Sequence, residues 1–309
     1  MTLHSKYNLI VILGPTASGK THLAVRLAGE TGSEIISADS RQVFRGMDIG
    51  TGKDLDEFKV EGKEVPAHLI DIMEPGEDFS VYNFQKGFYA AFHETRERGI
   101  IPILVGGTGL YLDAVLRGYS MQEVPINEGL RREFEGENIA NIADLLKAIN
   151  PALHNTTDLL DKNRAIRALE IALFEKEHPP DDPHIPHISP IVFGIRWERK
   201  VLRERITKRL KERLEKGLIE EVERLHKEGI SWERLDYFGL EYRFIGHYLQ
   251  GLSDKNEMFS RLNTAIHQFA KRQETWFRRM ERHGIKIHWI ENADYGRLKE
   301  ILDGERVFS

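Results

Sequence analysis

A complete phosphate-binding loop lies near the beginning of the chain, and it constrains the fold more than any other segment. Its pattern, G-x-x-x-x-G-K-[ST], is formed by Gly14, Pro15, Thr16, Ala17, Ser18, Gly19, Lys20 and Thr21. The glycines let the backbone turn so that several N–H groups point at one set of phosphate oxygens. Lys20 adds a positive charge, and the Thr21 hydroxyl can bind an accompanying Mg²⁺. Such a loop requires a strand before it and a helix after it, so it predicts both.

The segments on either side of the loop meet that requirement. Residues 7–13 are apolar and rich in β-branched side chains, as in a buried parallel strand. After the loop, Leu23, Ala24, Leu27 and Ala28 recur at helical spacing, and Gly32 stands where the helix would end. The sequence therefore predicts a strand, a loop and a helix in succession. The loop by itself does not distinguish ATP, GTP or a simpler diphosphate ester as its ligand.

Composition narrows the class of protein. The chain has 309 residues, of which 30% are charged and 40% hydrophobic, with a net charge of −5 and no cysteine. The lack of cysteine excludes disulfides and cysteine-based zinc sites. No apolar run approaches the roughly 18 residues of a membrane helix, and the first residues show no signal-peptide pattern. We therefore expect a cytoplasmic protein without membrane association, and nothing implies an obligate protein partner. The net charge argues against a generally basic nucleic-acid binder but permits a local basic patch.

Strand and helix patterns alternate in the N-terminal part of the chain. Residues 33–40, 68–73 and 100–105 are predicted strands, and residues 83–98 are a predicted helix with one apolar face. This alternation is typical of an α/β fold, here a P-loop NTPase-like core with a parallel β-sheet flanked by helices. Ligands of such folds bind beyond the carboxyl ends of the strands. The phosphate loop, Asp39-Ser40 and Gly106-Gly107-Thr108 are all predicted to lie there.

The pattern changes near residue 120. Residues 139–149 and 162–174 are predicted helices, and no strong strand signal returns before residues 191–195. We interpret residues 121–189 as a helical insertion domain. Residues 1–120 and 190–309 then form the α/β core with its C-terminal helices. The proline-rich segment 178–187 contains several histidines, but we interpret it as a linker rather than a metal site.

Two long helices are predicted in the second half of the chain. Residues 201–226 carry one apolar stripe, and we interpret most of the charges on the opposite face as solvated. Residues 257–283 form the final predicted helix, where Lys and Arg outnumber Glu. Together with Trp276 and Phe277, this excess indicates either a polyanion-binding face or a core aromatic pair flanked by solvated arginines. The sequence leaves that choice open.

Asp39 is the carboxylate best placed for catalysis. It is predicted to lie at the carboxyl end of the strand beside the phosphate-loop strand, where it could accept a proton from an attacking nucleophile. It could also hold Mg²⁺ through water or cap the following turn. The same core suits phosphoryl transfer or an alkyl transfer in which diphosphate leaves. Composition and spacing do not decide between these two reactions.

Nearly the whole chain also resembles the bacterial tRNA dimethylallyltransferases, or tRNA isopentenyltransferases (the bacterial IPP transferase family). The similar segments are residues 14–21, 38–53, 68–71, 105–111, 163–170 and 270–278. The phosphate loop is shared with many NTPases, whereas the blocks at 38–53 and 270–278 are far more specific. The resemblance implies transfer of a dimethylallyl group from dimethylallyl diphosphate to N6 of adenosine 37, in tRNAs that read codons beginning with U. The products would be N6-isopentenyladenosine and diphosphate.

The resemblance also implies roles for particular residues. Asp39, Thr108 and Lys20 would be catalytic, with Asp39 as the base and Thr108 orienting the flipped adenine. Residues 14–21 would bind the diphosphate, with Thr21 at the Mg²⁺ cofactor. The implied contacts to the tRNA anticodon stem-loop are Asp39, Ser40, Arg41, Gln42, Thr108, Arg131, Asn163, Arg164, Ala165, Ile166, Arg167, Arg243, Lys271 and Arg272.

Two positions depart from the family pattern. Relatives often carry Gly-Tyr-Lys or Gly-Tyr-Arg where this chain has Glu241-Tyr242-Arg243, which puts a carboxylate beside an expected phosphate contact. They often carry Thr-Arg where this chain has Ile266-His267. The alternatives to a prenyltransferase are a P-loop small-molecule or nucleotide kinase and an RNA-binding module with a degenerate nucleotide site. A choice between ATP and dimethylallyl diphosphate as ligand would separate the two enzymes.

Overall fold

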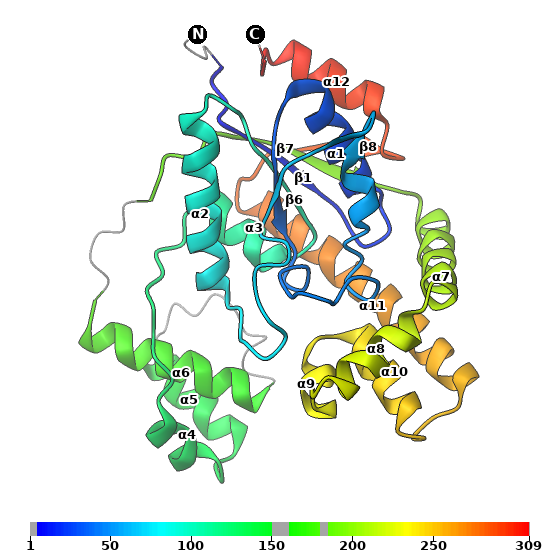
Figure 1. The fold of residues 1–309 in the computed structure, drawn as a ribbon. Helices are drawn as coiled ribbons and strands as arrows, with labels where there is room; N and C mark the ends of the chain where they lie inside the picture. The colour runs from blue at the N-terminus through cyan, green and yellow to red at the C-terminus, as the bar shows by residue number, and fades with distance from the viewer. Residues whose placement is uncertain (1–4, 150–160, 180–184, 309) are drawn as a thin grey trace. The chain divides into compact units, whose positions relative to one another are not determined.

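The structure is a computed structural model and describes residues 5–149, 161–179 and 185–308 (Figure 1). The chain forms two compact units: Met1–Gly118 with Pro186–Ser309, called the core unit below, and Tyr119–Ile185, called the insertion unit. These bounds lie close to those proposed from the sequence. No helix among the described residues combines the length and apolar character needed to cross a membrane.

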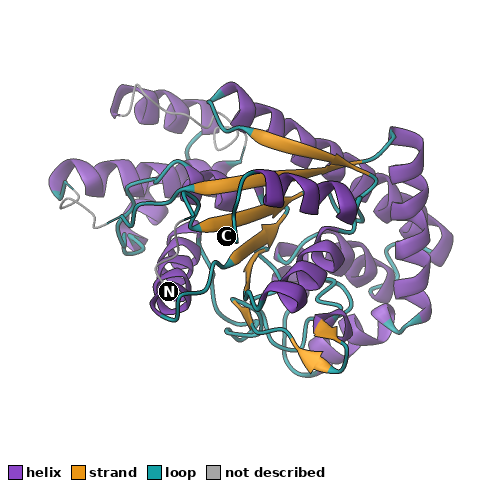
Figure 2. Ribbon diagram, turned by 90° about the horizontal axis from the view of Figure 1, so that it is seen from above, coloured by secondary structure: helices purple, strands orange, loops and turns teal. Residues whose placement is uncertain are grey.

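A six-stranded parallel sheet forms the centre of the core unit (Figure 2). Its strand order is β5-β2-β6-β1-β7-β8, with β1 Leu9–Leu13, β2 Ile35–Ala38, β5 Ala67–His68, β6 Ile103–Gly106, β7 Pro190–Arg196 and β8 Ile287–Glu291. In register, Gly106 pairs with both Leu13 and Ala38, so β1, β2 and β6 end at the same edge. The predicted convergence of the phosphate loop, Asp39 and Thr108 at this edge is therefore confirmed. A separate hairpin joins β3 Lys59–Val60 and β4 Lys63–Glu64.

Helices cover both faces of this sheet. Those of the core unit are α1 Lys20–Thr31, the 3-10 helix η1 Leu55–Phe58, α2 Val81–Glu97, α3 Gly109–Leu116, α7 Arg199–Glu215, α8 Leu218–Lys227, α9 Trp232–Tyr237, α10 Leu240–Leu249, α11 Lys255–Arg282 and α12 Tyr295–Gly304. Alternate β1 residues point to opposite faces. Leu9, Val11 and Leu13 pack with α2, α3 and α11, whereas Ile10 and Ile12 pack with α1 and α12.

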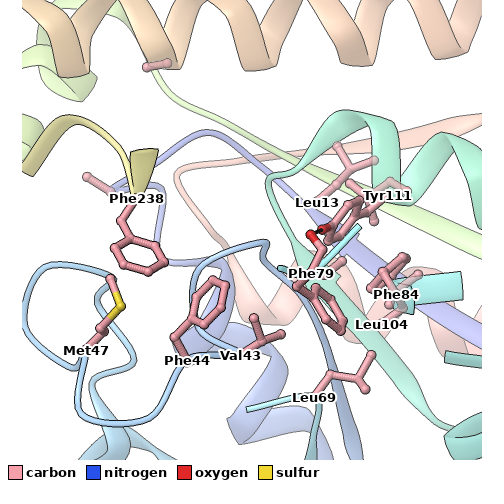
Figure 3. Close-up of a cluster of buried hydrophobic side chains, with 14 of the residues drawn as sticks. Leu13, Val43, Phe44, Met47, Leu69, Phe79, Phe84, Leu104, Tyr111 and Phe238 are labelled. Atoms are coloured by element: carbon pink, nitrogen blue, oxygen red, sulfur yellow. Dashed lines mark hydrogen bonds between the residues drawn. The ribbon is translucent and has the colours of Figure 1, made fainter. Parts of the chain in front are cut away.

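An aromatic cluster supports the loops that follow β2 and β6 (Figure 3). Phe84 of α2 stacks on Tyr111 of α3, with ring centroids 4.2 Å apart. Phe44, just after Asp39 in the chain, meets Phe238 edge-on at 4.9 Å. These contacts fix both loops against the sheet, so the polar groups they carry are held in place by buried apolar packing.

The insertion unit is helical, as predicted. It contains α4 Glu128–Phe134, α5 Ile139–Ile149 and α6 Lys162–Glu177. A small separate core of Ile142, Ala165, Ile166 and Leu169 holds the helices together. Part of the predicted linker, residues 180–184, lies outside the described residues.

The structure corrects three predicted elements. The strand expected at 68–73 ends at His68, because Leu69 and Asp71 adopt positive φ angles of 62° and 53° that no strand accommodates. The single helix expected at 201–226 is broken into α7 and α8 by Gly217, whose φ is 99°. The predicted final helix is followed by β8 and α12, which add an edge strand and cover it.

Candidate active site

The phosphate loop connects β1 to α1 and has the expected backbone shape. Ala17 and Gly19 have positive φ angles of 61° and 86°, and Gly19 forms the N-cap of α1. The Lys20 ammonium lies 3.4 Å from the Pro15 carbonyl oxygen. Burial, together with the nearby Arg209 guanidinium, lowers the pKa of Lys20 to about 8. The site therefore holds a positive charge that a bound anion would stabilise.

Asp39 directly follows β2 and faces the same space. Its Oδ1 accepts hydrogen bonds from the backbone N–H groups of Arg41, at 2.9 Å, and Gln42, at 3.4 Å. The turn-capping role considered from the sequence is therefore present. Capping by one oxygen orients the carboxylate and leaves the second oxygen available for a substrate proton, so the base role stays a prediction.

Thr108 and Gln273 connect the other walls of the site. Thr108 follows β6 and precedes α3, and its hydroxyl accepts the Ser40 N–H at 3.3 Å. Buried Gln273 of α11 accepts from Thr16 N–H at 2.8 Å and donates to the Gly107 carbonyl at 2.9 Å. This one amide thus ties the phosphate loop to the loop after β6. The family-specific block at 270–278 contained Gln273, but sequence reasoning gave it no role.

A cavity of about 300 Å³ brings these groups together. Its polar lining includes Thr16, Lys20, Thr21, Asp39, Ser40, Arg41, Gln42, Thr108, Arg209, Arg213, Glu241, Arg272 and Gln273. Its apolar lining includes Phe58, Val105, Phe238, Leu240, Ile266 and Phe269. A second, more open cavity of about 570 Å³ adjoins the loop and shares Lys20, Thr21, Arg209 and Arg213 with the first. The phosphate loop therefore borders both spaces.

Three arginines of α7 line the cavity that borders the phosphate loop, so they are exceptions to the interpretation that most charges of this helix are solvated. Arg205 donates from Nε to the Ala17 carbonyl at 2.9 Å, and Arg209 donates to Asp54 at 2.8 Å. Arg213 lies one turn further along. The four-residue spacing of these arginines, which puts them on one helix face, was the available signal. What they face depends on how α7 packs, and no local pattern contains that information.

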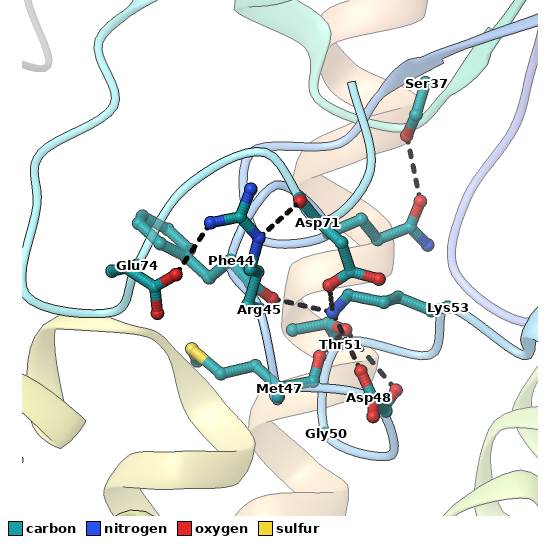
Figure 4. A network of polar contacts seen from close by, with 12 residues as sticks. Ser37, Phe44, Arg45, Met47, Asp48, Gly50, Thr51, Lys53, Asp71 and Glu74 are labelled. Carbon is teal, nitrogen blue, oxygen red and sulfur yellow. Dashed lines mark hydrogen bonds and ion pairs between the residues drawn. The ribbon is translucent and has the colours of Figure 1, made fainter. Parts of the chain in front are cut away.

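A buried lysine holds the segment that follows Asp39 (Figure 4). The fully buried Lys53 ammonium donates to the Phe44 carbonyl at 2.6 Å and to Asp48 at 2.8 Å, and it also contacts the Asp71 carboxylate. Gln42 accepts from the Ser37 hydroxyl and donates to the Gly52 carbonyl. Lys53 and Gln42 both belong to the 38–53 block, so side chains of that block shape one wall of the cavity.

The predicted tRNA contacts of the core unit differ in how far their side chains are engaged by the protein itself. Arg41 donates to the Tyr237 carbonyl at 2.8 Å and stacks over the Tyr237 ring. Lys271 and Arg272 are exposed on α11. In the same helix Phe277 is fully buried, which confirms the core interpretation for that ring and leaves the basic residues at the surface.

The insertion unit separates its five consecutive candidates by exposure. Asn163 and Arg164 are exposed, whereas Ala165 and Ile166 are buried in the small core of that unit. The buried side chains of Ala165 and Ile166 pack inside the unit, so a tRNA contact at these two positions stays a prediction that only their backbone could fulfil. Arg167, the last of the five, donates to the buried carboxylate of Glu170 at 2.7 Å. Arg131, the other candidate in this unit, donates to the same carboxylate at 2.8 Å.

The departures from the family pattern also have defined positions. Arg243 bonds to Asp236 at 2.6 Å, whereas the Glu241 carboxylate approaches Arg213 to 3.8 Å. The expectation that Glu241 stands beside Arg243 is therefore wrong, because residues two positions apart on a helix point to nearly opposite sides. Ile266 lines the smaller cavity, and His267 lies 3.3 Å from the Arg203 carbonyl oxygen outside it.

Comparisons with known proteins agree with this geometry. A family model described as IPP transferase matches residues 42–280, and one described as isopentenyl transferase matches residues 7–64. A tRNA dimethylallyltransferase 1 from Syntrophus aciditrophicus is 59% identical, over 96% of this chain and 98% of its own. A tRNA dimethylallyltransferase 2 from Pelobacter propionicus is also 59% identical, over 96% and 93%.

Solved structures give the same assignment. A tRNA isopentenylpyrophosphate transferase from Bacillus halodurans superposes with a TM-score of 0.69 at 33% identity, over 96% of both chains. A eukaryotic dimethylallyltransferase acting on tRNA has a TM-score of 0.76 at 21% identity, over 97% of this chain and 78% of its own, which speaks for the fold alone. With a phosphate loop, Asp39 and Thr108 around one cavity, and with matches over nearly its full length, this chain belongs to the IPP transferase family.

Proposed function

We propose that this protein transfers a dimethylallyl group from dimethylallyl diphosphate to N6 of adenosine 37 in tRNAs that read codons beginning with U. The products are N6-isopentenyladenosine in the tRNA and free diphosphate. The observation that carries the proposal is that Lys20, Asp39 and Thr108 line one cavity in a member of the IPP transferase family. The relatives named above are tRNA-modifying enzymes, and no observation favours the kinase alternative.

The lining of the cavity supports this chemistry. The N6 nitrogen attacks the allylic carbon of the donor, the carbon–oxygen bond to diphosphate breaks, and its electron pair leaves with the diphosphate. Asp39 takes the proton that N6 loses. Lys20 and Arg209 neutralise negative charge that grows on the leaving group. The reaction is complete without transfer of a phosphoryl group, so the phosphate loop acts on a leaving group.

The apolar part of the cavity fits the prenyl group. Its apolar lining consists of Phe58, Val105, Phe238, Leu240, Ile266 and Phe269. Positive charge develops on the allylic carbon during the transfer, and exclusion of water from this pocket prevents hydrolysis of the donor. We propose that these side chains hold the five-carbon group.

Mg²⁺ is proposed as the cofactor. Thr21 is the second residue of α1 and lines both cavities beside Lys20, so its hydroxyl fits one coordination position. The described residues contain no group of three His, Cys, Asp or Glu side chains that could hold an ion alone. Mg²⁺ commonly takes its remaining ligands from phosphates and water, which matches this donor set. When bound, the ion would neutralise part of the diphosphate charge.

The substrate base must leave its stack to reach this cavity. Adenosine 37 lies in a loop, where extrusion requires less energy than opening a duplex. Lys271 and Arg272 provide exposed charge on α11 for the RNA backbone, although the net charge of the chain is negative. We propose that the enzyme works in the cytoplasm, where its tRNA substrate is found.

Donor choice tests the proposal. The purified protein is incubated with an anticodon stem-loop and either labelled dimethylallyl diphosphate or ATP labelled at the γ-phosphate. We expect label in the RNA only from the prenyl donor, with release of diphosphate. Transfer of the γ-phosphate to any acceptor, with no use of the prenyl donor, would contradict the proposal.

A further inference from the structure

Arg213 of α7 has an unusual environment. Its side chain is only 11% exposed, yet none of its N–H groups makes a hydrogen bond within the described part of the chain. The nearest carboxylate oxygens, on Asp54 and Glu241, lie 3.9 and 3.8 Å away, beyond hydrogen-bond distance. Buried guanidinium groups normally satisfy most of their five donors. The donors of Arg213 are therefore free for a partner that binds in the adjoining space.

That space is the phosphate site. Arg213 lines both cavities that border the phosphate loop, and Lys20 and Arg209 line both as well. A side chain on Gly52 would overlap with the guanidinium groups of Arg209 and Arg213, so the two arginines lie side by side against that glycine. Three cations in close proximity repel one another, and a polyanion among them removes the repulsion.

We propose that Arg213 is a second guanidinium that binds the diphosphate, beside Arg209 and together with Lys20. A guanidinium presents a planar fork of donors that matches two oxygens of a phosphate. In that position Arg213 contacts the leaving group and stabilises the charge that accumulates on it. The inference rests on the proposed function, because it takes the diphosphate of a prenyl donor as the ligand.

Glu241 compensates the positive charge of the largely buried Arg213. Glu241 is the second residue of α10 and lines the smaller cavity, and its carboxylate lies 3.8 Å from the Arg213 guanidinium. Burial raises the pKa of Glu241, and Arg213 acts in the opposite direction. A buried charge needs a compensating one. Glu241 thus balances Arg213 without occupying its hydrogen-bond donors, which stay available for the diphosphate.

The experiment measures binding of inorganic pyrophosphate, with Mg²⁺ present, by isothermal titration calorimetry. For Arg213→Met we expect affinity about 10- to 100-fold weaker than in the unmodified protein, the effect of losing a charge-assisted hydrogen-bonding group. Lys211→Met is the matched control, because Lys211 is exposed on the same helix and borders neither cavity. We expect this control to bind pyrophosphate as the unmodified protein does.

A double variant separates binding from folding. Arg213→Met leaves the Glu241 carboxylate unbalanced, so the single variant could lose stability for that reason alone. Arg213→Met combined with Glu241→Gln removes both charges, and we expect it to regain thermal stability but not pyrophosphate affinity. Wild-type affinity in either variant would overturn the inference. Failure of the proposed function is a different result: the unmodified protein would then not prenylate RNA, whatever Arg213 does.

Discussion

Replacement of Glu221 by alanine is expected to lower the free energy of unfolding by about 3–5 kcal/mol. Glu221 lies on α8 and is 6% exposed. Its carboxylate accepts the backbone N–H groups of Asp48, Ile49 and Gly50 at 2.9, 2.7 and 3.0 Å. It also accepts the Tyr242 hydroxyl of α10 at 2.8 Å. One side chain therefore joins two helices to the turn that leads into the cavity wall.

The magnitude follows from these four bonds. Hydrogen bonds to a charged group contribute about 1.5–3 kcal/mol each, so the low end of a simple sum is about 6 kcal/mol. Contributions within one turn are not additive, and the three N–H groups gain some hydration once the carboxylate is gone. We therefore expect less than the sum and more than the loss of a single bond.

Urea unfolding followed by tryptophan fluorescence measures the change. Glu223→Ala is the matched control, because Glu223 is exposed on the same helix and its carboxylate pairs with Lys227 one turn away. That substitution should change the free energy of unfolding by less than about 0.5 kcal/mol. If Glu221→Ala also changed it by less than about 1 kcal/mol, the account of this carboxylate as the anchor of the turn would be refuted.

Three further predictions concern catalysis and binding. Asp39→Asn keeps an oxygen for the turn but cannot take a proton, so single-turnover prenylation should slow by about 10²- to 10⁴-fold with little change in donor affinity; an unchanged rate would exclude the base role. Donor affinity should fall as pH rises through about 8, because burial lowers the pKa of Lys20 to about 8 and only the charged form attracts diphosphate. The affinity of Lys20→Gln should not change over this pH range, and the same fall in that variant would assign the dependence to another group. tRNA affinity should decrease steeply with salt, and Lys271→Ala and Arg272→Ala should each reduce the slope by about 1; a flat profile would mean that these side chains do not meet phosphates.

Local patterns predicted the parts of the fold that depend on local physics. The phosphate loop requires its strand and helix, and both formed around it, with Gly32 ending α1 in the left-handed conformation. The helix at 139–149 has its predicted bounds because its apolar spacing is regular. By contrast, the apolar stripe of residues 201–226 continues past Gly217, so the spacing predicted one helix. The backbone nevertheless turns at Gly217 and begins a second helix there.

The charged side chains of the site were harder to predict. An amphipathic pattern shows that Leu202, Ile206 and Leu210 face the interior, but it says nothing about what the opposite face of α7 meets. Arg209 and Arg213 point at the phosphate loop because the chain returns to the sheet through β7 immediately before α7. Such contacts join residues nearly two hundred positions apart. They arise from tertiary packing, which a single sequence does not encode in any local spacing.

We propose that the phosphate loop binds the diphosphate that leaves when a dimethylallyl group is transferred to tRNA. The most direct measurement is mass spectrometry of adenosine 37 in tRNA incubated with the protein, Mg²⁺ and dimethylallyl diphosphate. We predict that this nucleoside gains the mass of one isopentenyl group, that fragmentation places the group on N6, and that Asp39→Asn abolishes most of the product. Unmodified adenosine 37 after incubation with active, folded protein would contradict the account.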